Sequence, residues 1–343
     1  MIVIDERTFL EKRKLYRPFS YTAEVTGRSY SLPLQRVITD FGADAAFNKI
    51  SNKLTEHYGI EVPESSAQKI TETHAEKIKE KEDLHGHVPK RVGEGCLICQ
   101  TDGTMVPIVE TCEKDEEGEF VDKRKTRSVC WKEGRLTLAR QKGRKDYVFG
   151  GTLGLADAAG DQWFYCAIRA GLGEQTEVHC VGDGAPWIVD QVDRVFGKKT
   201  GYLIDFYHLC DYLASASKQC SKDPKKWLEQ QKERMKKGLV NKVLQSLLPH
   251  IEPTQVKDTD APVRRCYRYI NNRLDQFDYK SAIENDLPIG SGEIESAHRY
   301  VIQDRLKLSG AWWKVNNAEN MLALRIIREN NEWDGYWENL KTA

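Results

Sequence analysis

The alternation of hydrophobic and polar positions divides the chain into a helical beginning, a central region of short strands and a helical remainder. Beyond an irregular start, residues 1–90 are predicted to be mainly helical, with two helices on either side of Gly59. The apolar positions of the first helix recur on one face at Ala46, Ile50 and Leu54. Two helices joined by a short glycine-containing link are typical of a DNA-binding helix-turn-helix, and equally of a plain helical hairpin.

From residue 93 the pattern changes to short runs rich in β-branched and aromatic residues. The runs predicted as strands are GCLICQTDGTMVPIV, KTRSVCWKEGRL, YVFGGTL, TEVHCVGD and GYLIDFYH. A helix over LADAAGDQWFYCAIRAGL precedes the fourth strand, and a helix over APWIVDQVDRVFG precedes the fifth. This succession is that of an α/β fold, with an RNase H-like mixed sheet flanked by helices.

Residues from about 209 to 284 are again nearly all helical, punctuated by prolines, and are predicted to be an insertion. We therefore expect a helical N-terminal region, the first part of a sheet domain, a helical insertion and a C-terminal helical part that completes the domain. These four segments comprise residues 1–92, 93–212, 213–284 and 285–343.

The composition excludes some classes of protein. No apolar run approaches the roughly 20 residues of a membrane-spanning helix, and the N-terminus lacks the features of a secretory signal. We therefore expect a cytoplasmic protein with no membrane partner. The 52 basic and 52 acidic residues cancel, which counts against a general attraction to nucleic acid. The stretch Lys218–Lys242 departs from this balance, with nine basic residues against three acidic ones, and is either a phosphate-contacting surface or a solvated helix face.

The nine cysteines of a chain without a secretory signal favour reduced thiols over a disulfide framework. Cys96 and Cys99 form a close pair, and Cys112 and Cys130 do not form a second one. A structural zinc ion on these four residues is one interpretation. The simpler one is that Cys96 and Cys99 alternate with apolar neighbours in a strand.

Acidic residues stand where predicted strands end. Asp183 ends the fourth strand between two glycines, in VGDG, and Asp102 ends the first strand, in CQTDGTMV. Glu295 lies in a predicted helix that follows the glycine loop of PIGSGEIESAHRYV. Helix capping is the simpler role for Asp183 alone, but open α/β sheets keep their ligand sites at such strand ends. Three converging carboxylates can hold two divalent cations for phosphoryl transfer, and oxygen ligands favour Mg²⁺ or Mn²⁺ over zinc.

The motifs VGDGAPWI, IDFYHLCDYL and PIGSGEIESAHRYVIQDRLKLSGAWW, followed by NMLALR, resemble those of insertion-sequence DDE transposases of the ISKra type. The resemblance extends from about residue 99 to residue 337. It implies that Asp102, Asp183 and Glu295 are the catalytic, metal-binding triad of an RNase H-like core. The glutamate of the family pattern GSGxxES corresponds to Glu295 and not to Glu293.

The resemblance also implies an activity, cofactors and partners. It implies metal-dependent DNA strand cleavage and strand transfer, with two divalent cations, Mg²⁺ or Mn²⁺. The implied partners are the element ends, the target DNA and further copies of the chain assembled on DNA, in a cytoplasm where the protein associates with chromosomal DNA. The chain departs from the family pattern at Asp211, where glutamate is expected, and in its short N-terminal region.

Other residues are candidates for supporting roles. Asp205 and His208, at the end of the fifth strand, are expected to cap the next helix or to orient metal or DNA. Residues predicted to contact DNA by base stacking or phosphate binding are Trp312, Trp313, Arg305 and Lys307, and in the basic stretch Lys225, Lys226, Lys236 and Lys237. Core packing is the alternative for at least one of the two tryptophans.

Two further functions fit parts of the sequence. A haloacid-dehalogenase-type phosphatase also uses strand-end DxDGT and GDG motifs to hold Mg²⁺. This chain has Gln100 where the nucleophilic aspartate of such a phosphatase must stand, and glutamine cannot form an aspartyl-phosphate. A transposase-derived DNA-binding protein without cleavage activity is the second alternative, although all three acids are present.

Overall fold

The computed structural model describes residues 6–11, 14–22, 30–82, 87–111, 122, 125–197 and 200–341. The chain folds into two compact units. One, called here the helical unit, comprises residues 1–83, 106–132 and 299–343; the other, the sheet unit, comprises residues 84–105 and 133–298. These units do not follow the four consecutive segments expected from the sequence.

The helical unit begins with a two-stranded antiparallel hairpin, β1 (Phe9–Glu11) and β2 (Lys14–Tyr16), followed by α1 (Pro18–Thr22). Its core helices are α2 (Leu32–Asp44), α3 (Phe47–Tyr58), α4 (Glu64–Glu80) and α14 (Val315–Glu329). The short α13 (Asp304–Leu306) and the C-terminal α15 (Trp333–Lys341) complete the unit. Helix α4 packs against α2, α3 and α14, so the last part of the chain is joined to the first.

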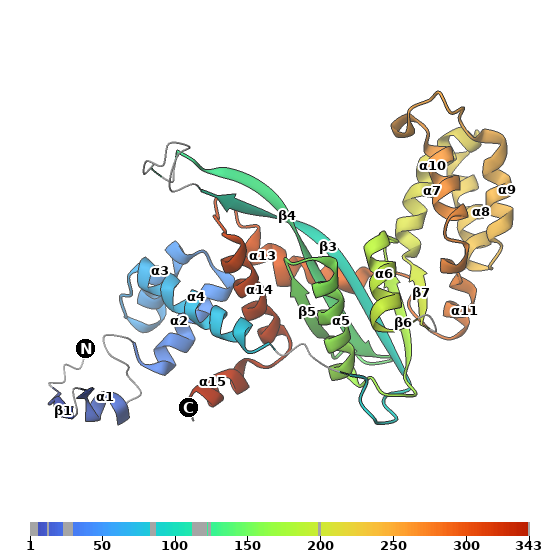
Figure 1. The fold of residues 1–343 in the computed structure, drawn as a ribbon. Coiled ribbons are helices and arrows are strands. Elements are labelled where there is room, and N and C mark those ends of the chain that lie inside the picture. The colour runs from blue at the N-terminus through green and yellow to red at the C-terminus, as the bar shows by residue number, and fades with distance from the viewer. Residues whose placement is uncertain are drawn as a thin grey trace, which may run out of the picture. The chain divides into compact units, whose positions relative to one another are not determined.

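Five strands form one sheet in the order β5-β4-β3-β6-β7 (Figure 1), and all of them lie in the sheet unit except residues 106–110 and 128–132. The strands are β3 (Cys96–Glu110), β4 (Ser128–Gln141), β5 (Val148–Thr152), β6 (Glu177–Gly182) and β7 (Gly201–Ile204). Strands β3, β6 and β7 are parallel neighbours, whereas β4 and β5 pair antiparallel. The sheet is therefore mixed, and the fold is a mixed α/β fold, as the order of elements predicted.

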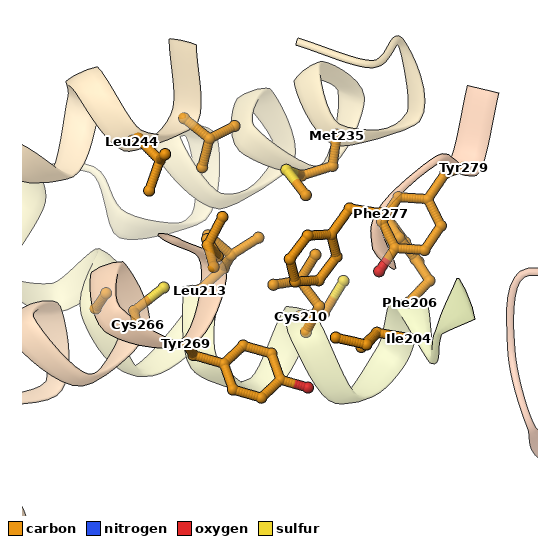
Figure 2. Packing of buried hydrophobic residues seen from close by; sticks show 14 of the residues in the cluster. Ile204, Phe206, Cys210, Leu213, Met235, Leu244, Cys266, Tyr269, Phe277 and Tyr279 are labelled. Carbon is orange, nitrogen blue, oxygen red and sulfur yellow. The ribbon is translucent and has the colours of Figure 1, made fainter. Parts of the chain in front are cut away.

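Helices cover both faces of this sheet because successive side chains of a strand point to opposite sides. Cys99 and Cys180 belong to a core cluster with α5 (Ala156–Ala170) and α6 (Pro186–Val195). Val181 and Leu203 belong to a second cluster, part of which Figure 2 shows. This second cluster joins the sheet to the helices of the predicted insertion: α7 (Phe206–Cys220), α8 (Pro224–Lys236), α9 (Val240–Leu247), α10 (Pro262–Asn271) and α11 (Tyr279–Glu284).

Three boundaries differ from those predicted. The fifth strand ends at Ile204, and residues 206–208 already belong to α7, because the Asp205 side chain caps that helix by accepting a hydrogen bond from the His208 amide. The first helix before Gly59 is two helices, which break at residues 45 and 46. The irregular start contains the β1–β2 hairpin.

In the described part of the chain, no helix has both the length and the hydrophobicity that crossing a membrane requires.

Candidate active site

The strand register brings three aspartates to one end of the sheet. Gln100 of β3 pairs with Val181 of β6, so two residues further along each strand Asp102 and Asp183 come level. Gly182 of β6 pairs with Ile204 of β7, and the next residues are Asp183 and Asp205. Asp183 and Asp205 therefore follow the carboxyl ends of β6 and β7, in the place where α/β sheets bind their ligands. Asp102 was predicted to end the first strand, but it lies inside β3, which continues to Glu110, and it is level with the end of β6.

The two glycines around Asp183 allow a close approach of neighbouring groups. A Cβ atom on Gly182 would lie 2.9 Å from the Tyr202 hydroxyl. Gly184 has a φ of +84°, which favours glycine, and a Cβ atom there would lie 2.9 Å from the Tyr269 hydroxyl. Beyond this turn, the Ala185 amide donates to Oδ1 of Asp183 over 2.8 Å. The VGDG sequence thus forms a tight turn, and a backbone amide two residues after Asp183 holds its carboxylate.

A strap of residues 288–294 crosses the same sheet face and leads into α12 (Gly292–Ala297). His179 Nε2 lies 2.8 Å from the carbonyl oxygen of Pro288. The Gln100 amide donates to the Gly290 carbonyl over 3.4 Å and accepts from the Ile294 amide over 3.1 Å. Gln100 therefore fixes the start of α12 on β3, at the position where a phosphatase of the alternative class would need its nucleophile.

Helix α12 carries two glutamates with different surroundings. Glu293 forms an ion pair with Arg140 of β4 at 2.9 Å and accepts a hydrogen bond from Gln100. Glu295 instead lies 3.3 Å from the Ser291 hydroxyl and is close enough to Asp102 for its charge to act on that carboxyl. Glu293 is thus engaged by an arginine of the sheet, and Glu295 faces the aspartates.

The carboxylates repel one another at Asp102. Burial is the largest influence that raises the pKa of Asp102, and the charges of Asp183, Glu295 and Glu133 raise it further; a hydrogen bond from the Gly103 amide opposes them. The pKa of Asp102 reaches about 6. A partly buried carboxyl whose pKa is raised by burial and by neighbouring acids is typical of a functional site.

Asp205 is buried and its side chain is fully engaged. Oδ1 accepts from the His208 amide over 2.8 Å, which confirms the predicted helix cap. Oδ2 accepts from both the amide and the hydroxyl of Ser291, and the hydroxyl contact is 2.6 Å long. Because the same hydroxyl reaches Glu295, Ser291 links the capping aspartate to the glutamate of α12.

Two residues near the acids were not singled out from the sequence. The buried His298 has Nε2 3.5 Å from Oδ2 of Asp102. It stands three residues after Glu295, close to one helical turn, and this spacing was the signal available in GEIESAH. Tyr269, on α10, donates to the carbonyl oxygen of Asp183 over 2.8 Å, and no local pattern marks it.

The residues predicted to contact DNA differ in exposure. Arg305 is buried in the helical unit, where its guanidinium donates to the Gly42 carbonyl and lies 4.7 Å from the Phe47 and Trp313 rings. Trp313 is also buried, so one of the two tryptophans packs in a core as the alternative had it. Trp312 is 52% exposed, and the Arg127 guanidinium lies 4.3 Å from its ring.

The lysines predicted to contact DNA also differ in their surroundings. Burial lowers the pKa of Lys307. Lys225, Lys226 and Lys237 are exposed, whereas Lys236 is half-buried and lies 3.7 Å from Glu233. Helix α4 is the second helix of the predicted helix-turn-helix. It packs against three helices but keeps an exposed stripe of mixed charge: Glu64, Ser65, Lys69, Glu76, Lys77 and Glu80.

The cysteines give no metal site within the described residues. Cys99 is buried beside Cys180, its register partner, and burial raises the pKa of its thiol well above the usual range. Cys96 lies in the same strand, and Cys112 lies outside the described residues. Over the described ranges, no three His, Cys, Asp or Glu side chains are arranged to hold a single metal ion.

Comparisons with known proteins place the chain in a family. No curated protein matches it. A family model described as "Uncharacterised protein family (UPF0236)" matches residues 112–338, about two thirds of the chain. The match begins after Asp102 and includes Asp183, Asp205 and Glu295. The chain therefore belongs to the uncharacterised protein family UPF0236.

Proposed function

We propose that this protein is a DDE transposase of the ISKra type, which cleaves and joins DNA with two divalent cations, Mg²⁺ or Mn²⁺. One observation carries the proposal. Asp102, inside β3, is level with Asp183, which follows the end of the adjacent parallel strand β6, and Glu295 of α12 is near enough to help raise the pKa of Asp102. Acids on the first and fourth strands, together with one on a late helix, are the arrangement that the resemblance implies.

The order of elements supports an RNase H-like core. Strands β3, β4 and β5 come first, then α5, β6, α6 and β7, which is the succession expected from the sequence. Helices α7–α11 then separate β7 from α12, so the glutamate reaches the sheet only after the inserted helices. Trp312 and Arg127 offer an exposed aromatic and cationic pair of the kind that contacts nucleic-acid bases and phosphates.

The donor set fits divalent cations. Asp102, Asp183 and Glu295 would hold them, since all three offer carboxylate oxygens and their mutual repulsion at Asp102 would be relieved by positive charge. In phosphoryl-transfer sites Mg²⁺ takes one or two protein carboxylates, with water and substrate phosphates as its other ligands. Two such cations therefore do not need all three carboxylates around one point.

The chain's own residues orient the acids. The Ala185 and Gly103 amides each donate to one carboxylate oxygen, of Asp183 and of Asp102. The Ser291 hydroxyl donates to Oδ2 of Asp205 over 2.6 Å and lies 3.3 Å from Oε1 of Glu295. When bound, the two cations supply the charge that stabilises the attacking and leaving oxygens of an in-line displacement at phosphorus.

The proposed reaction has two steps of this kind. Water first hydrolyses a phosphodiester bond at an element end and releases a 3′-hydroxyl. That hydroxyl then attacks a phosphodiester of the target DNA, so one bond to phosphorus forms as another breaks. The protein would act on chromosomal DNA as an oligomer assembled on the element ends.

DNA cleavage by the purified chain tests the proposal. The substrate is a plasmid that carries the natural DNA on both sides of the coding region, incubated with Mg²⁺, with Mn²⁺ or with a chelator. We expect cation-dependent breaks at one defined position in each flank, with 3′-hydroxyl ends. A plasmid without the flanks is the control. Flank binding without breaks under any cation would favour the non-cleaving DNA-binding alternative.

A further inference from the structure

The inserted helices reach the backbone of the loop that carries Asp183. Tyr269, in the C-terminal half of α10, donates its hydroxyl to the Asp183 carbonyl over 2.8 Å. Figure 2 shows the Tyr269 ring at the border of the core cluster, with its hydroxyl directed away from Cys266. Although Tyr269 is 86 residues from Asp183 in the sequence, it contacts the central residue of the VGDG turn.

The neighbouring Gly184 is held at both of its backbone polar groups. Its amide donates to the Tyr202 hydroxyl over 3.0 Å, and its carbonyl accepts from Arg273 Nη2 over 3.4 Å. A side chain at Gly184 would collide with the Tyr269 hydroxyl, so the turn and the tyrosine fit each other closely. Two residues of the insertion, Tyr269 and Arg273, therefore hold consecutive carbonyls of the turn.

Tyr269 is itself rigidly placed. Its ring stacks on Tyr212 of α7, with centroids 4.1 Å apart and an angle of 10° between the planes. The Arg273 guanidinium lies 4.6 Å from the Tyr269 ring, and the His208 ring lies 6.0 Å away. The hydroxyl can therefore turn toward the Asp183 carbonyl while the ring stays fixed by its neighbours.

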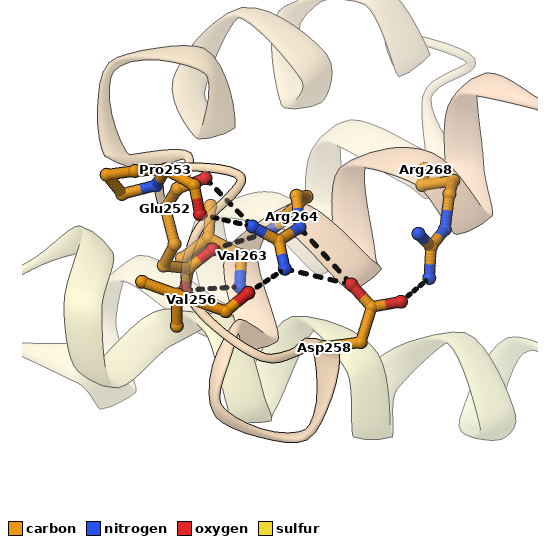
Figure 3. A network of polar contacts seen from close by, with 7 residues as sticks. All are labelled: Glu252, Pro253, Val256, Asp258, Val263, Arg264 and Arg268. Atoms are coloured by element: carbon orange, nitrogen blue, oxygen red, sulfur yellow. Dashed lines mark hydrogen bonds and ion pairs between the residues drawn. The ribbon is translucent and has the colours of Figure 1, made fainter.

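The N-terminal end of α10 is anchored by a separate polar network (Figure 3). The Glu252 carboxylate accepts from the Val263 and Arg264 amides over 3.0 and 2.7 Å. The Arg264 guanidinium donates to the Val256 carbonyl and pairs with Asp258, which also pairs with Arg268. Helix α10 is thus fixed at its start and presents its far end to the VGDG turn.

We infer that Tyr269 is a positioning residue: its hydrogen bond to the Asp183 carbonyl sets the backbone of the turn and so the direction of the Asp183 carboxylate toward a divalent cation. This inference rests on the proposed function. A carbonyl left without its donor lets the peptide between Asp183 and Gly184 rotate, since glycine restricts that peptide little. The carboxylate would then lose the orientation that cation binding requires.

Replacement of Tyr269 by phenylalanine tests the inference. The change removes one hydroxyl and keeps the ring that stacks on Tyr212. The probe is Mn²⁺ alone, titrated by calorimetry into the full chain without DNA. We expect Tyr269→Phe to weaken Mn²⁺ binding about tenfold, the effect usual for a lost partner of a metal ligand. Tyr267→Phe, on the same helix, is the matched control and should bind Mn²⁺ as the wild type does.

Three outcomes have distinct meanings. Wild-type affinity in a folded Tyr269→Phe chain, with affinity still lost in Asp183→Asn, would overturn the inference and leave the proposed function standing. No Mn²⁺ binding by the wild-type chain would overturn both. If Tyr269→Phe does not fold, Arg273→Gln keeps the tyrosine stack and removes the contact with Gly184; an Mn²⁺ affinity equal to that of the wild type would then also count against the inference.

Discussion

Asp102, Asp183 and Glu295, called here the sheet-end acids, have electrostatic surroundings opposite to those of Asp258 in the inserted helices. Asp258 pairs with Arg264 and Arg268, at 2.9 and 2.6 Å, and its hydrogen bonds with the two arginines hold its pKa below the usual range. Asp102 is partly buried among Asp183, Glu295 and Glu133, and its pKa is raised to about 6. In the described part of the chain, no lysine or arginine forms an ion pair with Asp102, Asp183 or Glu295.

This contrast separates acids that serve the fold from acids that oppose it. The Asp258 network contains its own cations and fixes a loop on α10. No lysine or arginine of the described residues forms an ion pair with the sheet-end acids, and the ionisation of Asp102, whose pKa is raised, costs the folded state free energy. Clusters that oppose folding in this way are typical of sites where an external cation completes the charge balance.

The largest expected effect comes from removing one charge of the sheet-end acids. Asp183→Asn keeps the shape of the side chain but removes a carboxylate, so we expect cleavage of the flanking DNA to fall by more than about 100-fold. Asp102→Asn and Glu295→Gln should act alike. Rates of strand breakage in Mg²⁺ are the measurement, with circular dichroism to verify folding. Asp190→Asn, an exposed aspartate on α6, is the matched control. A folded Asp183→Asn chain that cleaves at the wild-type rate would show that Asp183 holds no metal.

The next effect concerns the balanced network. Arg264→Ala removes a guanidinium that contacts three backbone carbonyls and Asp258, and it leaves the carboxylate paired with Arg268 alone. We expect the free energy of unfolding to fall by about 2–3 kcal/mol. Urea denaturation measures it. Arg265→Ala, at an exposed position one residue away, should cost less than about 1 kcal/mol. Equal losses in the two variants would mean that the network adds nothing to stability.

Ionised Asp102 should lower the free energy of unfolding, which is the opposite of the effect of the Asp258 network. Its pKa in the folded chain, about 6, lies above its ordinary value of 3.8, so the folded state binds the proton more tightly than the unfolded state. Stability therefore declines as the pH rises from about 4 through about 6 and is then level. Because 30% of the side chain is exposed, we expect Asp102→Asn to raise the free energy of unfolding at pH 7.5 by roughly 1–2 kcal/mol.

The control for this prediction is pH itself, with Mg²⁺ as a second test. At pH 4 the wild type and Asp102→Asn should unfold at nearly equal urea concentrations. At pH 7.5 millimolar Mg²⁺ should stabilise the wild type and leave Asp102→Asn much less affected, because only the wild type has the full set of acids. A wild-type stability that does not change between pH 4 and 7.5 would contradict the uncompensated charge.

Much of the sheet was predictable because its signals are local. The five strands follow from β-branched runs, and the cap at Asp205 follows from an aspartate between a strand and an amphipathic helix. The position of Asp183 at the end of its strand was also predicted, whereas Asp102 lies inside β3 and not at its end. What a residue does immediately beside its own element could therefore be inferred from the sequence.

Contacts between distant segments could not be inferred in this way. Arg305, predicted to meet phosphates, is buried between Phe47 and Trp313 because α2, α3 and the C-terminal helices share one unit, and nothing in the local sequence indicates that packing. The same holds for Ser291 between Asp205 and Glu295, and for Tyr269 at Asp183. Each of these pairings depends on tertiary structure, which single-sequence patterns do not contain.

The smallest expected effect lies in the basic stretch Lys218–Lys242, which includes α8. If Lys225, Lys226 and Lys237, all exposed, contact DNA phosphates, their replacement by alanine should weaken binding to every DNA sequence alike. Each lost phosphate contact should reduce the slope of log affinity against log salt by about one unit. Lys236 lies near Glu233, so adding its replacement should change the slope less.

Fluorescence anisotropy at several salt concentrations measures the slope, with Ser65→Ala and Lys69→Ala in α4 as a comparison. Those α4 changes should alter the preference for the element ends if that helix enters a groove. An unchanged slope in the triple lysine variant would make the stretch a solvated face and leave the DNA to follow another path.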